Sequence, residues 1–213
     1  MTNKKNNISI NEKLKFFDKL EWLSPSLGDE PEKERRIIAI MAKPNEEGLI
    51  KEFFIADLLV SLSGKILSRI ACLNKIQHED YTMAAFTYFT EELVDHSFSH
   101  FESPSRNYEV LEKEVLEKFS EEDDCVAIVM LAYDLQAYKD LNYYEIIRFC
   151  LMGRYFEESG WALNGNGFAK EFMECFDVVK WMPFNIMRVM DKLRSRHITK
   201  ENENGKKEET SIH

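Results

Sequence analysis

Two histidines four residues apart give this sequence its clearest candidate for a metal site. His96 and His100 share one face of a helix if their segment is helical, and Glu92 lies one turn earlier on the same row. Carboxylate and imidazole groups inside a helical bundle are the ligands of di-iron sites. The Glu-x-x-His spacing of those sites is absent, because Asp95 stands where the histidine belongs.

A structural interpretation competes with the metal hypothesis. Histidines near the end of a helix are stabilised by the negative end of the helix dipole, and they can be hydrogen-bonded or partly exposed without binding anything. A lone pair of histidines four residues apart is a weak motif. The sequence therefore raises a metal bound by Glu92, His96 and His100 as one hypothesis, and it indicates no other cofactor.

The other residues that often carry chemistry form no catalytic pattern. No serine or cysteine lies in a nucleophile elbow, and the Asn-Gly-Asn-Gly segment at 164–167 lacks the Walker spacing and predicts a turn. The four cysteines show neither a CxxC pair nor zinc-binding spacing, which is typical of free, buried thiols in a reducing compartment. These cysteines are Cys72, Cys125, Cys150 and Cys175.

The C-terminal third is rich in aromatic and methionine residues. A hydrophobic core explains most such stripes. Two tryptophans, however, stand at predicted helix boundaries beside turns, with methionines close by, and this combination is typical of a partner groove or an oligomer interface. The candidate partner-binding residues are Trp161, Trp181, Met182, Met187 and Met190.

Charge is unevenly distributed along a chain whose net charge is -10. Residues 109–124 are strongly acidic, which is typical of a solvated helix face. The last predicted helix is basic, and this end could bind nucleic acid, an acidic partner or the acidic face of a second copy. The net charge argues against non-specific DNA binding over the whole surface. The basic residues are Arg188, Lys192, Arg194 and Arg196.

The sequence predicts that the elements that position these residues are helices. Residues 49–76 are apolar over most of a helical circumference, so they predict a central helix that is covered on several sides. Asp57, Lys65 and Arg69 interrupt the run, so it predicts no membrane span. The resulting prediction is an all-α, single-domain bundle of about eight helices around 49–76.

Caps, prolines and apolar spacing divide the rest of the chain into further predicted helices. Val126 to Leu131 has local strand character, but the capping signal at Ser120 favours a helix there. We expect a disordered lead at 1–8, one domain at 9–198 and a disordered charged tail at 199–213. The predicted helices cover 11–23, 31–42, 80–101, 107–119, 121–138, 143–158, 168–180 and 184–198.

These patterns favour a non-enzymatic regulatory protein that binds a partner protein through the C-terminal third, and they leave open that a second copy of the chain is a partner as well. No apolar stretch follows the N-terminal lysines, so we expect no signal peptide and a cytoplasmic location. A metal-binding enzyme or sensor using Glu92, His96 and His100 is the first alternative. A nucleic-acid-binding regulator using the basic last helix is the second, and its affinity would fall steeply with salt.

Overall fold

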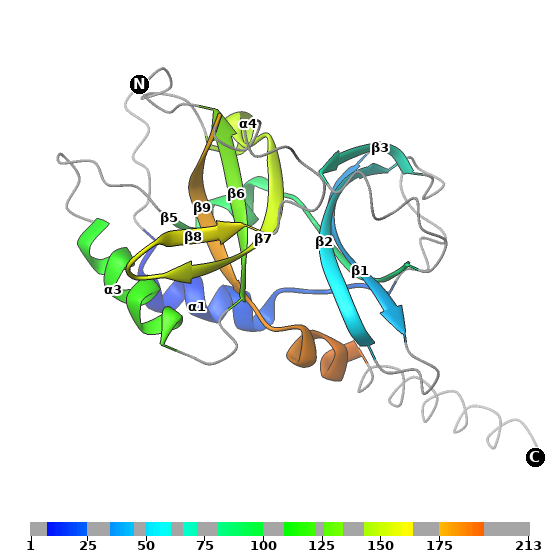
Figure 1. The fold of residues 1–213 in the computed structure, drawn as a ribbon, viewed down its shortest axis with the longest axis horizontal. Helices are drawn as coiled ribbons and strands as arrows, with labels where there is room; N and C mark the ends of the chain where they lie inside the picture. Colours follow the sequence, from blue (N-terminus) through cyan, green and yellow to red (C-terminus); the bar gives the residue numbers. More distant parts are fainter. Residues whose placement is uncertain are drawn as a thin grey trace, which may run out of the picture.

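The computed structural model shows two antiparallel sheets joined face to face, with short helices around them (Figure 1). The first sheet contains β1 (Arg35–Pro44), β2 (Ile50–Val60), β3 (Ile66–Ala71) and β4 (Thr82–Tyr88), in the order β3-β2-β1-β4. The second contains β5 (Phe98–Ser99), β6 (Val126–Tyr133), β7 (Phe149–Phe156), β8 (Gly160–Leu163) and β9 (Phe176–Phe184), in the order β5-β9-β6-β7-β8.

The helices are α1 (Ile10–Lys19), α2 (Glu91–His96), α3 (Glu109–Ser120), α4 (Tyr143–Ile146) and a further helix over residues 186–193. The structure describes residues 8–24, 35–44, 50–60, 66–71, 81–99, 109–121, 126–133, 143–163 and 175–193. The predicted disordered lead, apart from residue 8, and the predicted tail at 199–213 lie outside these ranges.

The prediction of an all-α bundle is wrong, and its central helix at 49–76 is instead the strands β2 and β3. Strand β2 is buried on both faces. Ile55 packs into the core between the sheets, whereas Phe54 and Leu58 pack into a separate cluster on the outer face of the first sheet. A strand covered on both faces loses its polar alternation, so its apolar run cannot be told from a buried helix by periodicity.

Most of the other predicted helices are also strands. The predicted helix 31–42 is β1, 121–138 contains β6, and the end of 168–180 is the start of β9. The range 80–101 divides into β4, α2 and β5, and 143–158 divides into α4 and β7. Helices do lie within the ranges 11–23, 107–119 and 184–198, at α1, α3 and residues 186–193 with small shifts at their ends.

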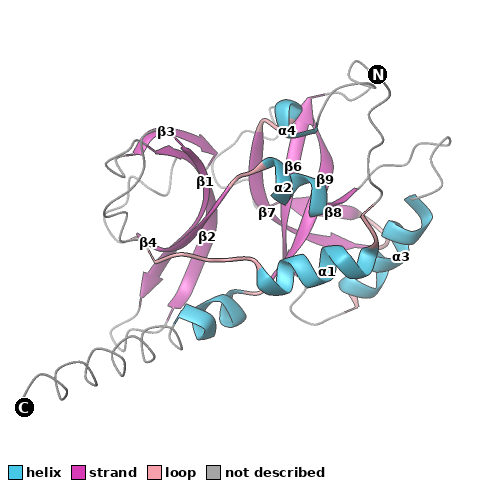
Figure 2. Cartoon of the chain, turned by 180° about the vertical axis from the view of Figure 1, so that it is seen from behind, coloured by secondary structure: helices cyan, strands magenta, loops and turns pink. Residues whose placement is uncertain are grey.

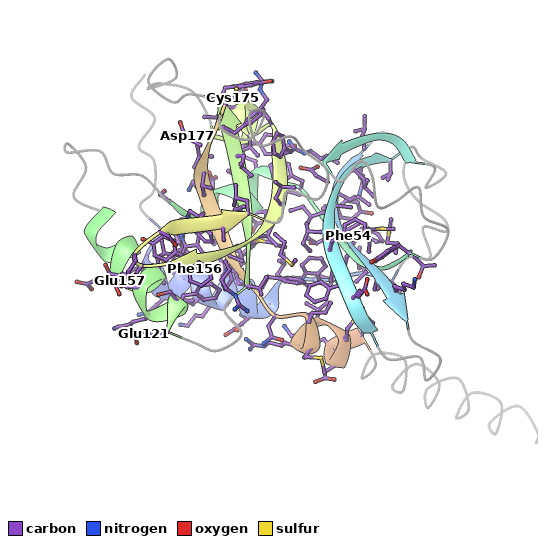
Figure 3. All side chains as sticks on the ribbon, viewed as in Figure 1. Phe54, Glu121, Phe156, Glu157, Cys175 and Asp177 are labelled. Atoms are coloured by element: carbon purple, nitrogen blue, oxygen red, sulfur yellow. The ribbon has the colours of Figure 1, made fainter. Side chains whose placement is uncertain are left out.

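The core between the sheets is built mainly by the two central strands. Ile38 and Ile40 of β1 and Ile128 and Met130 of β6 are completely buried in one cluster. On the outer face of the second sheet, Val129 and Leu131 pack with Leu116 of α3. On the outer face of the first sheet, Ile37, Ala39 and Phe54 form a third cluster, and Phe54 is labelled in Figure 3.

The two sheets repeat one arrangement. Strands β1 to β4 pair in the order β3-β2-β1-β4, and β6 to β9 pair in the corresponding order β8-β7-β6-β9. The pairing of β1 with β4 shifts its register between Ile40 and Met41. The pairing of β6 with β9 shifts its register at a comparable point, between Met130 and Leu131. The chain therefore contains the same four-stranded unit twice, and β2 of one unit lies beside β7 of the other.

The helices that follow the two units also correspond. Phe89 follows β4, Phe184 ends β9, and both rings pack into the core between the sheets. The next residue caps a helix in each case, because the backbone N–H of Leu93 donates to Thr90 Oγ1 at 3.1 Å and that of Arg188 donates to Asn185 Oδ1 at 3.0 Å. Helix α2 and the helix 186–193 therefore hold equivalent places.

Candidate functional site

A largely buried ion pair joins the two sheets where β2 lies beside β7. The Arg36 guanidinium donates from Nε and Nη2 to the two carboxylate oxygens of Asp57, at 2.9 and 2.7 Å. It also donates to the backbone carbonyls of Ile147 and Arg148 at 3.0 and 3.1 Å. Asp57 Oδ2 in turn accepts from the backbone N–H of Cys150 at 2.8 Å. The pair thus fastens β1 and β2 to the start of β7.

The pKa values of Arg36 and of the neighbouring Cys150 are both raised in this environment. Burial acts to lower the pKa of Arg36, but the hydrogen bond and charge of Asp57 outweigh it and raise the pKa above its ordinary value. Burial and the adjacent Asp57 carboxylate raise the pKa of the Cys150 thiol well above its ordinary value. A thiol that stays protonated is a poor nucleophile, so this cluster is suited to holding the sheets together rather than to catalysis.

A second polar contact fixes α1 to the second sheet. Lys13 of α1 and Lys180 of β9 each donate to the backbone carbonyl of Ser97, both at 3.1 Å, and both side chains are buried. The Lys13 ammonium also lies 5.4 Å from the centre of the Phe98 ring. Ser97 is the C-cap of α2, so this one carbonyl brings together α1, α2 and β9.

The structure describes two of the three residues of the predicted metal site. Glu92 and His96 both lie in α2, where His96 Nδ1 is 2.9 Å from the backbone carbonyl oxygen of Glu92. The His96 ring stacks on Phe16 of α1, with centroids 4.1 Å apart and an interplanar angle of 15°. His100 lies outside the described residues. Among the residues that the structure describes, no group of three or more His, Cys, Asp or Glu side chains could hold a metal ion.

Three of the predicted partner-binding residues lie in the second sheet and not at a helix boundary. Trp181 is 1% exposed and stacks on Phe98, with ring centroids 4.8 Å apart. Trp161 of β8 lies 6.0 Å from Trp181, centroid to centroid, and is partly buried. Met182 is 1% exposed in the core between the sheets. A partner could reach Trp181 or Met182 only if the sheet opened.

The other two predicted partner-binding residues lie on the helix 186–193. Met187 is 63% exposed, and Met190 is partly buried against the core between the sheets. Val189 and Leu193 of the same helix are buried, so its inner face is anchored while Met187 remains in solvent. This is the part of the sequence-based partner site that the structure places on the surface.

The two described residues of the predicted basic patch make contacts within the chain. Arg188 Nη2 lies 2.8 Å from Asp18 Oδ1, and Lys192 Nζ donates to the backbone carbonyl of the same residue. Asp18 belongs to α1, so these contacts place the end of α1 beside the helix 186–193. Arg194 and Arg196 lie outside the described residues.

Helix α1 and the helix 186–193 together form the surface that we name the helical face. Figure 2 shows the two helices next to each other along the lower edge of the molecule. Two of the four exposed large apolar side chains in the described part of the chain lie on them, Leu14 at 41% and Met187 at 63%. Phe16, Leu20 and Met190, which pack on the core between the sheets, remain partly exposed beside them.

Reading the sequence alone missed the contribution of α1 to this surface. Within the predicted helix 11–23, Leu14, Phe16 and Phe17 are all apolar. At 3.6 residues per turn, however, Leu14 lies about 110° from the line midway between Phe16 and Phe17. That angle was the available signal that Leu14 points away from the core.

In the described part of the chain, no helix is both long and apolar enough to cross a membrane. Comparison of the chain with protein-family models, with curated proteins and with solved structures gave no match.

Proposed function

We propose that this protein acts by binding another protein through the helical face. The observation that carries the proposal is Met187, which is 63% exposed on a helix whose other apolar side chains are buried or partly buried. Exposed methionine is adaptable and is enriched in protein interfaces, and arginine, present here as Arg188, is enriched as well. Burying one such side chain fully contributes about 1.5–3 kcal/mol.

The composition of the helical face supports a protein rather than a nucleic acid as its partner. Arg188 and Lys192 already bind Asp18, so they would have to give up this contact to reach a phosphate. The net charge of -10 also opposes association with a polyanion. We place this activity in the cytoplasm, because the spacing of the four cysteines suits a reducing compartment.

The test compares two exposed apolar residues on different sides of the molecule. Met187→Glu introduces a charge on the helical face. Phe156→Glu, at a residue 45% exposed beside Glu157 near α3, is the matched control (Figure 3). Both variants and the unaltered chain are cross-linked in their source cells, purified and analysed by mass spectrometry. Melting temperatures confirm that both variants are folded.

The expected result is a stoichiometric protein that Met187→Glu loses at least tenfold and Phe156→Glu retains. A second copy of this chain showing the same pattern would identify the protein as its own partner. Retention of every cross-linked protein by Met187→Glu, or the absence of any stoichiometric partner from the unaltered chain, contradicts the proposal.

A further inference from the structure

We propose that the partner bound at the helical face is a second copy of this chain, oriented so that α2 of each copy lies against the helix 186–193 of the other. The proposal rests on the proposed function and names the partner. Three observations carry it: the arrangement of three helices on one side of the molecule, the opposite charge of the two ends of this arrangement, and the apolar side chains exposed between the ends.

Helix α1 connects α2 to the helix 186–193 on one side of the molecule (Figure 2). It begins beside α2, where Lys13 donates to the backbone carbonyl of the C-cap residue Ser97. It ends beside the helix 186–193, where the Asp18 carboxylate pairs with Arg188. A two-fold axis that crosses α1 near its middle therefore places the α2 end of each copy over the opposite end of the other.

The α2 end of this arrangement is acidic. Helix α2 has three carboxylates, all on exposed residues, and no lysine or arginine, and α1 adds one exposed carboxylate in its first turn. Lys13 of α1 is buried, and its ammonium is directed to the Ser97 carbonyl. The surface at this end therefore presents mainly negative charge. Its carboxylates belong to Glu12, Glu91, Glu92 and Asp95.

The opposite end holds a cluster of cations. Lys19 lies in the last turn of α1, and the helix 186–193 adds Arg188 and Lys192, against the carboxylates of Asp18 and Asp191. The Arg188 guanidinium contacts Asp18 from Nη2, but it has five N–H donors and its side chain is 62% exposed. It can therefore also bind a carboxylate of the second copy. On a chain with a net charge of -10, this end is a local excess of positive charge.

Charge selects between the two ways in which a two-fold axis can join these surfaces. An axis that runs along α1 would place α2 of one copy against α2 of the other, and their carboxylates would repel. An axis that crosses α1 instead places the carboxylates of each α2 over the cations of the other copy. The favourable contact then occurs twice, once on each side of the axis.

The region between the two ends is apolar. Leu14 of α1 is 41% exposed and Met187 is 63% exposed, with Phe16 and Leu20 partly exposed beside them. Apolar side chains surrounded by charged ones are the usual composition of a protein interface, which has an apolar centre and a polar rim. A second copy brings the same apolar centre and the complementary charges by symmetry.

The experiment measures the oligomeric state of the full chain by sedimentation velocity at micromolar concentrations. Two variants reverse the charge of one end each. The first, Glu92→Lys with Asp95→Lys, reverses the acidic end. The second, Lys19→Glu with Arg188→Glu, reverses the cationic end.

A control variant separates the effect of these positions from that of net charge. Glu114→Lys with Glu121→Lys makes the same change in net charge as the first variant. Both residues are exposed, in α3 and directly after it, and α3 packs on the outer face of the second sheet. Melting temperatures confirm that all variants are folded.

The unaltered chain and the control variant should form dimers. Each reversed variant should dimerise at least tenfold more weakly, because like charges then face each other at both ends of the interface. An equimolar mixture of the two reversed variants should restore dimers to within threefold of the original affinity. In the mixed dimer, the lysines of one α2 face the introduced glutamates of the other copy, and the remaining two ends keep their original charges.

Three results overturn the proposal. A chain that is monomeric throughout this concentration range does not bind itself. Unchanged dimerisation of the reversed variants means that the dimer uses a different surface. Reversed variants that stay monomeric when mixed show that the two ends do not face each other. A monomeric chain whose cross-linked protein is still lost on Met187→Glu would remove this inference and leave the proposed function standing, so the two can fail separately.

Discussion

Arg36 and Asp57 show how a charged residue can mislead a reading of the sequence. Asp57 interrupts the apolar run that predicts the central helix, yet it is completely buried in a strand and bound by a guanidinium from the neighbouring strand. A buried carboxylate is tolerated because its partner is close, but the partner precedes it by 21 residues, and sequence spacing does not reveal such a contact. Met187 was predicted as a partner-binding residue together with Trp161, Trp181, Met182 and Met190, and of these five it alone has an exposed side chain.

Replacing one member of the Arg36–Asp57 pair should destabilise the fold more than replacing both. Asp57→Ala leaves the largely buried Arg36 guanidinium without its carboxylate, so we expect the free energy of unfolding to fall by about 3–5 kcal/mol. The double variant Arg36→Met, Asp57→Ala should be more stable than Asp57→Ala. Urea unfolding measures both. A loss below about 1 kcal/mol for Asp57→Ala would show that the junction between the sheets does not depend on this pair.

The two described cysteines should differ sharply in reactivity. Cys150 is buried and the pKa of its thiol is raised, whereas Cys175 is exposed. Alkylation of the native protein at neutral pH, followed by peptide mass spectrometry, should modify Cys175 at least a hundredfold faster than Cys150. In urea the two rates should converge. Equal rates in the native protein would mean that β7 opens readily at the junction with β2.

At the scale of elements, the sequence placed three helices near their observed positions but predicted none of the strands. A helix that covers one face keeps a recognisable apolar period, as in α3 and the helix 186–193. The strands β1, β2 and β6 are covered on both faces, so their apolar runs carry no period of two. The sequence Val126–Leu131 showed strand character, but the cap signal at Ser120 outweighed it, and Ser120 instead ends α3.

The equivalence of α2 and the helix 186–193 can be tested through their caps. Thr90→Ala and Asn185→Ala each remove a side-chain oxygen that accepts the backbone N–H three residues later. Each substitution should lower the free energy of unfolding by about 1 kcal/mol. The matched controls are Thr90→Ser and Asn185→Asp, which keep an acceptor and should lose less. A cost confined to one of the two sites would show that the caps are not equivalent in energy.

At the scale of the whole molecule, the repeated units share one core. Ile38 and Ile40 from the first sheet pack with Ile128 and Met130 from the second, and Phe89 and Phe184 extend the same cluster. The sequence did not reveal the repetition, because the equivalent positions are occupied by different residues: Thr90 corresponds to Asn185, and the helices α1 and α3 pack in different places. The repetition lies in strand order and backbone pairing, which side-chain periodicity does not record.

A shared core predicts that the two units unfold together. Ile128→Ala opens a cavity between the sheets, and Ile37→Ala opens one on the outer face of the first sheet, each at a completely buried residue. Each substitution should lower the free energy of unfolding by about 2–5 kcal/mol. Each variant should lower the urea midpoint of a single unfolding transition, and far-UV circular dichroism and tryptophan fluorescence should give the same midpoint. We expect this because neither sheet can unfold without exposing the inner face of the other. If the units were independent, Ile37→Ala would lower the midpoint by circular dichroism while the fluorescence of Trp161 and Trp181 in the second sheet kept its original midpoint.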